Sequence, residues 1–354
     1  MRQQIHYAAS GDGLRLAWAE LGRGRPLVKA ATWLTHLQYD QESPVWAHWL
    51  RFLGANFRYI RYDERGCGMS DRDATELSLA SWVDDLAHVV DAARVERPFV
   101  LLGISQGAAT AIRYAVRHPE RVSHLVLYGG YAIGGNRADD PERRALFKAV
   151  MEVAGLGWGS DNPAFRQMFT TRFLPSGTPA QIEWISELCR RTTSQESAIR
   201  LLRARGEVDV RDLLDLVRVP TLVVHCDGDQ IAPLSQGRML ASRIPGASFV
   251  QLDSNNHVLL EHEPAWRDFQ EAVLGFTGVA TGTGEAAPVA DLTQREQAAL
   301  HLLCEGQSNA QIAWQLGVAE KTVRNHLSNL YRKLGVRSRA EAIVRAHRHA
   351  GQGG

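Results

Sequence analysis

The chain has 354 residues, 45% of them hydrophobic, and a formal net charge of +1. It is longer than an ordinary single domain and rich enough in apolar residues to bury large cores, so we expect two domains. No apolar run approaches the roughly 18 residues that a membrane span needs, and the first residues lack the apolar core of a signal peptide, which predicts a cytoplasmic protein with no membrane partner.

Charge is distributed unevenly along the chain. Residues 291–354 hold nine Lys and Arg against five Asp and Glu, which leaves 31 against 34 in residues 1–290. A basic terminal segment indicates an anionic partner for that segment, although charge alone leaves a chance surface fluctuation open. We expect reduced thiols and neither a metal nor a cofactor, because no metal-ligand spacing connects the four cysteines, Cys67, Cys189, Cys226 and Cys304.

Strand and helix patterns alternate through residues 13–128 and return after residue 220. Helical spacing of apolar residues marks residues 45–53 and 79–95. Short apolar or alternating runs predict strands at residues 13–20, 26–30, 57–62, 99–102, 122–128, 220–225 and 247–252. Such alternation predicts a mostly parallel sheet covered by helices on both faces.

A serine between two glycines follows the apolar run at residues 99–102. Gly103, Ser105 and Gly107 form a G-x-S-x-G motif that leads into a helix, the pattern of a nucleophile elbow. Chance matches to this motif are common. Its interpretation therefore depends on whether the chain also supplies a base, an acid and oxyanion donors.

The regular alternation breaks between about residues 131 and 210. This stretch has helical periodicity and several aromatic residues, namely Phe147, Trp158, Phe165, Phe169, Phe173 and Trp184. It predicts a helical insertion that caps the functional edge of the sheet. An ordinary helical subdomain with no role in ligand binding is the alternative, because apolar stripes usually form core.

Two later strands end in residues that complete a catalytic triad. Asp227 and Asp229 follow the strand at 220–225, and His257 follows the strand at 247–252. Catalytic groups of open parallel sheets collect at the carboxyl ends of strands. In this arrangement His257 accepts the Ser105 proton, and the acid orients the imidazole and stabilises its charged form.

Because the chain supplies a serine, an acid and a histidine in this order, residues 5–276 resemble an α/β-hydrolase of the cap-bearing type. The segments that carry the resemblance are residues 62–70, the elbow, residues 225–233 and residues 256–257. The resemblance implies Asp229 as the acid, with Asp227 as the second choice. It also implies that the backbone N–H groups of Trp33 and Gln106 stabilise an oxyanion. Residues 31–33 read Ala-Thr-Trp where relatives have His-Gly, so Trp33 is placed to narrow or fill the site, which counts against efficient turnover but not against ligand binding.

A stretch rich in Gly and Thr separates this part from the C-terminal segment. Residues 277–290 have no periodicity and are interpreted as a flexible linker between domains at 1–276 and 291–354. Thr293 and Glu296 form a capping box at the start of a helix that ends at Gly306. Helices at 309–316 and 320–334, joined by the turn 317–319, then predict a helix-turn-helix.

The helix at 320–334 has two different faces. Its apolar stripe contains Val323, Leu327, Leu330 and Leu334, and polar residues occupy another side. Arg324 and Asn325 are placed to reach base edges, and Ser328 lies on the same polar face. Lys321, Thr322 and Arg332 are suited to hold phosphates. A solvated basic helix is the alternative.

The C-terminal segment closely resembles the LuxR-type DNA-binding domain. The resemblance covers about 60 residues and includes Ser308-Asn309, residues 321–326 and residues 333–339. It implies a bacterial regulator that pairs on double-stranded DNA, with the helix after Ser338 as a dimer contact. We therefore interpret the chain as an α/β-hydrolase fold with a helical cap, joined to a small all-α helix-turn-helix domain.

This architecture is compatible with three functions. The hydrolase fold can sense a small molecule and control DNA binding. It can instead be a working serine hydrolase, of esterase or lactonase type, to which a DNA-binding domain is attached. In the third possibility the triad remains from an ancestral enzyme but has no catalytic activity, and the fold only binds a ligand.

Overall fold

The computed structural model describes residues 3–158, 160, 162, 164–279, 292–334, 336, 339, 342, 343, 345 and 346. Within this part, no helix is both long and apolar enough to cross a membrane. Most of the predicted linker, from residue 280 onward, lies outside the described residues.

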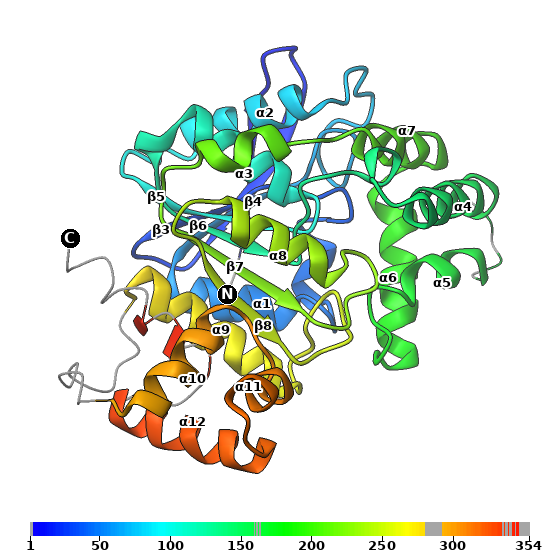
Figure 1. Ribbon diagram of the computed structural model, residues 1–354. Coiled ribbons are helices and arrows are strands. Elements are labelled where there is room, and N and C mark those ends of the chain that lie inside the picture. The colour runs from blue at the N-terminus through cyan, green and yellow to red at the C-terminus, as the bar shows by residue number, and fades with distance from the viewer. Residues whose placement is uncertain are drawn as a thin grey trace.

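An eight-stranded sheet forms the centre of the hydrolase part, in the order β1-β2-β4-β3-β5-β6-β7-β8 (Figure 1). Neighbouring strands from β4 to β8 are parallel, whereas β2 pairs antiparallel with both β1 and β4. The strands are β1 (Gln4–Ala9), β2 (Arg15–Leu21), β3 (Pro26–Lys29), β4 (Arg58–Tyr62), β5 (Phe99–Ile104), β6 (Val122–Tyr128), β7 (Thr221–Cys226) and β8 (Ser248–Leu252). The mostly parallel sheet is confirmed, and β1 is an edge strand that the sequence analysis missed.

Helices cover both faces of this sheet (Figure 1). One face packs against α2 (Leu79–Ala92), α3 (Gly107–Arg117) and α8 (Leu234–Arg243). The other packs against α1 (Ala47–Asn56) and α9 (Pro264–Thr277). The central strands β5 and β7 are buried along their whole length, as expected for parallel strands between two helical layers.

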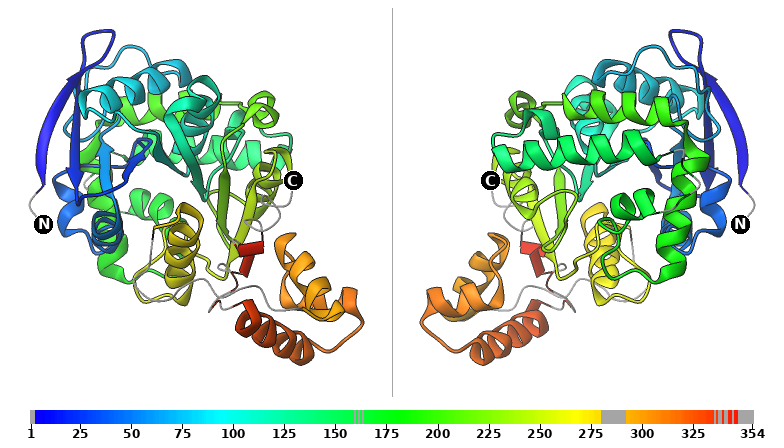
Figure 2. Two further views of the ribbon diagram at one scale, coloured as in Figure 1. Left: turned by 90° about the vertical axis from the view of Figure 1, so that its left-hand side faces the viewer. Right: turned by 90° about the vertical axis from the view of Figure 1, so that its right-hand side faces the viewer.

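The insertion between β6 and β7 contains four α-helices among its described residues. They are α4 (Pro141–Gly157), α5 (Ala164–Thr170), α6 (Pro179–Thr192) and α7 (Gln195–Gly206). Thr178 and Gln181 form a capping box at the start of α6, where Pro179 occupies the first turn. The four helices lie together at one end of the sheet (Figures 1 and 2).

The described residues of the C-terminal part include the helices α10 (Gln294–Cys304), α11 (Asn309–Leu316) and α12 (Glu320–Leu334). Capping boxes begin α10 and α11, and Gly317 ends α11 with a φ of +64°. Val323, Leu327, Leu330 and Leu334 of α12 are buried, as predicted. Of the fourth predicted helix, residues 342, 343, 345 and 346 are helical and most of the rest lies outside the described residues.

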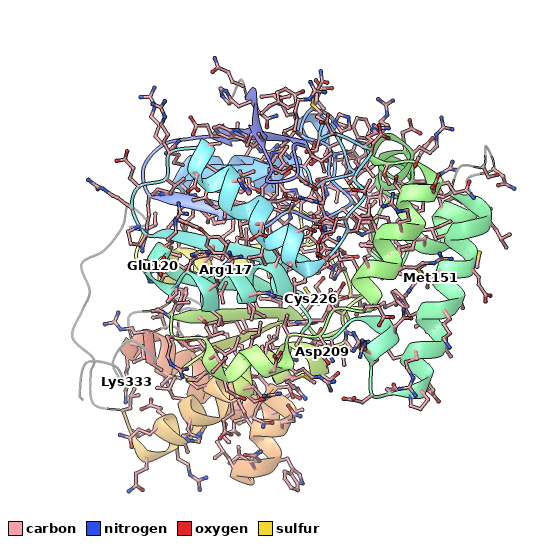
Figure 3. The ribbon with its side chains drawn as sticks, turned by 90° about the horizontal axis from the view of Figure 1, so that it is seen from above. Arg117, Glu120, Met151, Asp209, Cys226 and Lys333 are labelled. Carbon is pink, nitrogen blue, oxygen red and sulfur yellow. The ribbon has the colours of Figure 1, made fainter. Side chains whose placement is uncertain are left out.

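The C-terminal helices pack near the β8 edge of the sheet, away from the insertion. A Cβ atom on Gly306, after α10, would stand 2.6 Å from the ring of Phe249 in β8, so backbone and ring are in direct contact. Seen from above, Met151 of α4 and Lys333 of α12 lie at opposite ends of the molecule, with Cys226 of β7 between them (Figure 3). The sheet therefore separates the insertion from the helix-turn-helix.

Candidate functional site

Ser105 occupies a strained turn between β5 and α3. Its φ is +52°, which is uncommon for a residue with a side chain and typical of a nucleophile elbow. A Cβ atom on Gly103 would stand 2.8 Å from Ala108 Cα, and one on Gly107 would stand 3.1 Å from the Ala30 carbonyl oxygen. Both glycines of the motif are therefore required by close packing around the turn.

His257 and Asp229 form a buried hydrogen-bonded pair. His257 Nδ1 lies 2.6 Å from Asp229 Oδ2, and Asp229 Oδ1 accepts from the N–H groups of Ile231 at 2.8 Å and Ala232 at 3.0 Å. Burial acts to raise the pKa of Asp229, but the charge of His257 and these hydrogen bonds hold it below its usual value. The carboxylate therefore stays ionised and directs the Nδ1 proton towards itself.

The other candidate acid lies elsewhere. Asp227 is exposed, and its oxygens accept from the Ser254 N–H and the Gln251 side chain, each at 3.3 Å. The residue directly after β6 is Gly129, with a φ of +53°. A Cβ atom there would stand 3.3 Å from His257 Cε1, so the backbone itself packs against the imidazole.

The Nε2 atom of His257 is buried and has no hydrogen-bond partner within the described part of the chain. His257 and Ser105 line the same pocket. The backbone N–H of His257 donates to the Phe173 carbonyl oxygen at 2.8 Å, so the insertion helps to hold the histidine loop. This leaves Nε2 available as a base towards whatever occupies the pocket.

The expected oxyanion donors, the backbone N–H groups of Trp33 and Gln106, make no hydrogen bond within the described residues. The loop of Trp33 contacts the elbow, because a Cβ on Gly107 would stand 3.3 Å from the Ala31 carbonyl oxygen. The Trp33 ring stacks on Trp158 of the insertion, with ring centroids 5.1 Å apart. Trp33 thus forms a wall of the site, and open space remains on both sides of it.

Two cavities meet at Ser105, and we call them the polar lobe and the apolar lobe. Their volumes are about 110 and 40 Å³, and Trp33, Ser105, Gln106 and Phe173 line both. The polar lobe also contacts Tyr131, Gly135, Arg143, Leu146, Phe147, Val150, Phe169, Arg172, Leu202 and Ile231. The apolar lobe also contacts Thr32, Leu34, Trp46, Ile104, Ile185, Leu188, His257 and Val258. The insertion therefore provides much of the wall of the pocket.

Sequence reasoning missed the charged residues around the elbow. Arg143 and Arg172 of the insertion line the polar lobe, and no motif marks either position. Arg205 of α7 forms a buried ion pair with Glu64 and also contacts the Gln106 carbonyl oxygen at 3.4 Å. Glu64 and Arg205 lie 141 residues apart in the chain, so no local pattern connects them.

The DNA-reading side chains predicted on α12 are only partly described. The backbone of α12 is described throughout, but the side chains of Lys321, Arg324, Asn325, Ser328 and Arg332 lie outside the described residues. Thr322, the remaining predicted contact, is partly exposed, and its N–H donates to Ala319 at 2.8 Å in the first turn. The buried stripe of α12 fixes which side of the helix remains for DNA.

Comparison with known proteins agrees with this architecture. A family described as "Serine aminopeptidase, S33" matches residues 47–264, and one described as "Bacterial regulatory proteins, luxR family" matches residues 290–346. The AB hydrolase superfamily protein YisY of Bacillus subtilis is 27% identical over 71% of this chain and 92% of its own length. A 2-hydroxymuconate semialdehyde hydrolase of a Pseudomonas species is 31% identical over 57% of this chain and 72% of its own length.

A solved structure is also similar to this chain. A hydrolase from Pseudomonas aeruginosa superposes with a TM-score of 0.64 at 26% identity, covering 78% of this chain and 98% of its own. The luxR family model accounts for the C-terminal helices, and the hydrolase family model lies within the part that precedes them. The chain belongs to the α/β-hydrolase family described as serine aminopeptidase S33, and it carries a C-terminal DNA-binding domain of the luxR family.

Proposed function

We propose that this protein is a bacterial transcriptional regulator that binds a small molecule beside Ser105 and double-stranded DNA through α11 and α12. The observation that carries the proposal is that one chain contains both a pocket at Ser105 and a helix-turn-helix domain. The contact of Gly306 with Phe249 supports a physical connection between the pocket and the helix-turn-helix. Phe249 lies in β8, and the loop after β8 holds His257 at the pocket.

The proposal includes the boundaries and assembly of the protein. Residues 1–276 form the sensor, with residues 131–210 as its cap, residues 277–290 are the linker, and residues 291–354 bind DNA. The protein acts in the cytoplasm as a homodimer on DNA. Occupancy of the pocket changes how the two DNA-binding domains pair.

The test is whether pocket occupancy changes DNA affinity. Duplexes selected from a random pool would be titrated with the full-length protein at one fixed salt concentration. Esters, lactones and aromatic metabolites would first be screened by thermal shift. A compound that raises the melting temperature is expected to change the Kd for DNA by roughly 5- to 150-fold. A compound bound in the pocket without any change in Kd would contradict the sensor role.

The polar face of α12 supports a prediction about DNA recognition. Arg324→Ala is expected to cost about 1–3 kcal/mol and to relax base preference at one position, because an arginine on a base edge reads sequence. Lys321→Ala is expected to weaken binding to all sequences and to reduce the salt slope by about 1, because it loses one phosphate contact. Binding to selected and scrambled duplexes across a salt series measures both effects.

Lys148→Ala serves as the control for this series. Lys148 is an exposed lysine of α4, so its loss removes the same charge far from the DNA-binding domain. Its salt slope should match that of the unaltered protein. The proposed roles would be wrong if Lys321→Ala kept the full salt slope or if Arg324→Ala kept the full base preference.

A second candidate function is serine hydrolysis, which the 2.6 Å contact between His257 and Asp229 favours. Ser105 Oγ attacks an ester carbonyl while His257 Nε2 takes its proton, and the N–H groups of Trp33 and Gln106 stabilise the oxyanion. His257 then protonates the leaving alcohol. Water, activated by His257, releases the acid and restores Ser105.

A fluorophosphonate probe distinguishes a working triad from a silent one. Attack by Ser105 Oγ forms a bond to phosphorus and expels fluoride, which requires an activated nucleophile. Labelling that disappears in Ser105→Ala would establish the hydrolase candidate. No labelling of the unaltered protein would leave the fold as a binding module, and the transcriptional response of Ser105→Ala would show whether chemistry is part of sensing.

A further inference from the structure

Two arginines of the polar lobe have no acidic partner. Arg143 of α4 and Arg172, after α5, line the lobe beside Ser105, and neither forms an ion pair within the described part of the chain. Each donates one hydrogen bond there, Arg143 to the Ile133 carbonyl oxygen at 3.1 Å and Arg172 to the Gln230 carbonyl oxygen at 2.6 Å. A guanidinium has five N–H donors, so most of this capacity remains for a ligand.

Three buried arginines of the hydrolase part have acidic partners, whereas a fourth, Arg166, donates to Ser186 and to the Trp158 carbonyl oxygen. Arg61, Arg65 and Arg205 are buried, and each contacts a carboxylate. A charge removed from water needs such a partner, because its desolvation is otherwise uncompensated. Arg143 and Arg172 are partly buried, and burial lowers the pKa of both side chains. A ligand anion would compensate these two charges as the protein's own acids compensate Arg61, Arg65 and Arg205.

The acids around the two arginines are already engaged. Asp229, whose charge acts on Arg172, is bonded to His257 and to two backbone N–H groups. Asp140 and Asp139, whose charges act on Arg143, accept from the Glu142 N–H at 2.9 Å and pair with Arg211 at 2.8 Å, respectively. The described residues that form the wall of the polar lobe include the two arginines and no acid, so the lobe carries net positive charge.

The lobe on the other side of Ser105 has no arginine among the described residues of its wall, whereas the polar lobe holds two arginines among mostly apolar side chains. Trp46, Ile185, Leu188 and Val258 give it an apolar wall. A ligand that fills both lobes therefore has an anionic end and an apolar end. Its middle passes Ser105 and the free N–H groups of Trp33 and Gln106, which suit a carbonyl oxygen.

We propose that the ligand is an organic carboxylate with an ester or lactone carbonyl between the carboxylate and an apolar group. Arg143 and Arg172 bind the carboxylate, the apolar lobe takes the hydrocarbon end, and the carbonyl lies at Ser105. The inference rests on the proposed function, because it names the class of molecule sensed or hydrolysed at that pocket. Charge-assisted hydrogen bonds of this kind favour the anion over a neutral analogue by roughly 10- to 100-fold in Kd.

The test compares two probes that differ by one methyl group. Monobutyl succinate carries the carboxylate, and butyl methyl succinate masks it as a second ester. Both would be titrated by calorimetry into full-length Ser105→Ala protein, which keeps the esters intact. We expect the monoester to bind roughly 10- to 100-fold more tightly than the diester. Arg143→Met or Arg172→Met in the same background should remove most of that preference.

Two controls separate loss of the charge from loss of the pocket. Lys148→Met removes a positive charge from the exposed side of α4 and should keep the full preference. Diester affinity should be unchanged in Arg143→Met and Arg172→Met, which shows that the lobes remain open. Equal affinity for both probes, binding of neither, or an unchanged preference in both arginine variants would overturn the proposal.

These outcomes are independent of DNA binding. If the monoester binds through the arginines while the Kd for DNA stays constant, the sensor function fails and the ligand class stands. If only neutral compounds bind and also change the Kd for DNA, the ligand class fails and the sensor function stands.

Discussion

Replacing Asp229 by asparagine is expected to slow fluorophosphonate labelling of Ser105 by roughly 10⁴-fold, the scale seen when a triad acid loses its charge. Asp229 Oδ2 lies 2.6 Å from His257 Nδ1 and holds the proton on that nitrogen. An asparagine presents either an amide N–H, which forces the proton to Nε2, or a carbonyl without charge. His257 Nε2 then accepts the Ser105 proton poorly. Intact mass spectrometry at successive times measures the labelling rate.

Asp227→Asn provides the matched control for this prediction. Asp227 belongs to the same loop, but it is exposed and bonded to Ser254 and Gln251. Its replacement makes the same chemical change two residues away and should leave the labelling rate within about twofold. Equal rates for Asp229→Asn and the unaltered protein would mean that the acid does not support the nucleophile.

The residues of the proposed triad were predictable because each of them follows the end of a strand. Ser105, Asp229 and His257 each follow a short apolar run, and parallel strands bring their carboxyl ends to one edge. Gly103 and Gly107 lie where the turn packs against neighbouring backbone so closely that a side chain would not fit. The order of these signals along the chain therefore specified both the sheet and the edge that carries the site.

The walls of the pocket were not predictable in the same way. Arg143 and Arg172 lie in an insertion whose helices follow ordinary amphipathic patterns, and their position depends on how those helices pack over the sheet. Trp33 lines both lobes, and its ring stacks on Trp158, 125 positions later in the chain, so its position depends on how the insertion packs. β1 was not predicted because it is an edge strand with most of its residues exposed or partly exposed, so it lacks the apolar run that marks a buried strand.

The helix-turn-helix was predictable from its caps and its apolar stripe. Thr293, Ser308 and Gly317 mark the helix ends in the sequence, and the structure places α10 and α11 between them. The contact of Gly306 with Phe249 had no such signal, because it depends on how two domains pack. Contacts between elements distant in the chain thus account for most of what the sequence analysis missed.

The largest effect on stability is expected from Arg205→Met, which should lower the free energy of unfolding by about 3–5 kcal/mol at pH 8, the usual cost of stranding one partner of a buried ion pair. Arg205 lies 3.5 Å above the Trp82 ring and pairs with Glu64, and both charged side chains are buried. Its loss leaves the Glu64 carboxylate buried without a cation. Urea unfolding followed by tryptophan fluorescence measures the loss, because eight of the nine tryptophans lie in residues 1–276.

The pH dependence of this loss identifies Glu64 as its cause. Burial raises the pKa of Glu64 to about 7 even with Arg205 beside it, and removal of Arg205 raises it further. A carboxyl whose folded pKa is raised binds more protons folded than unfolded, so it costs least below its unfolded pKa and most above its folded pKa. The destabilisation by Arg205→Met should therefore be smaller at pH 5.5 than at pH 8. Glu64→Gln added to Arg205→Met should restore part of the stability at pH 8 and remove the pH dependence.

Arg203→Met is the control, because Arg203 lies on the same helix with its side chain exposed. It should change the free energy of unfolding by less than about 0.5 kcal/mol at either pH, as is usual for surface positions. A loss in Arg205→Met that is equal at both pH values, and that Glu64→Gln does not reduce, would assign the effect to lost packing on Trp82. If the stranded carboxylate causes the loss, the loss is instead larger at pH 8 and Glu64→Gln reduces it. These two results distinguish the ion pair from side-chain packing as the interaction that holds α7 to the loop after β4.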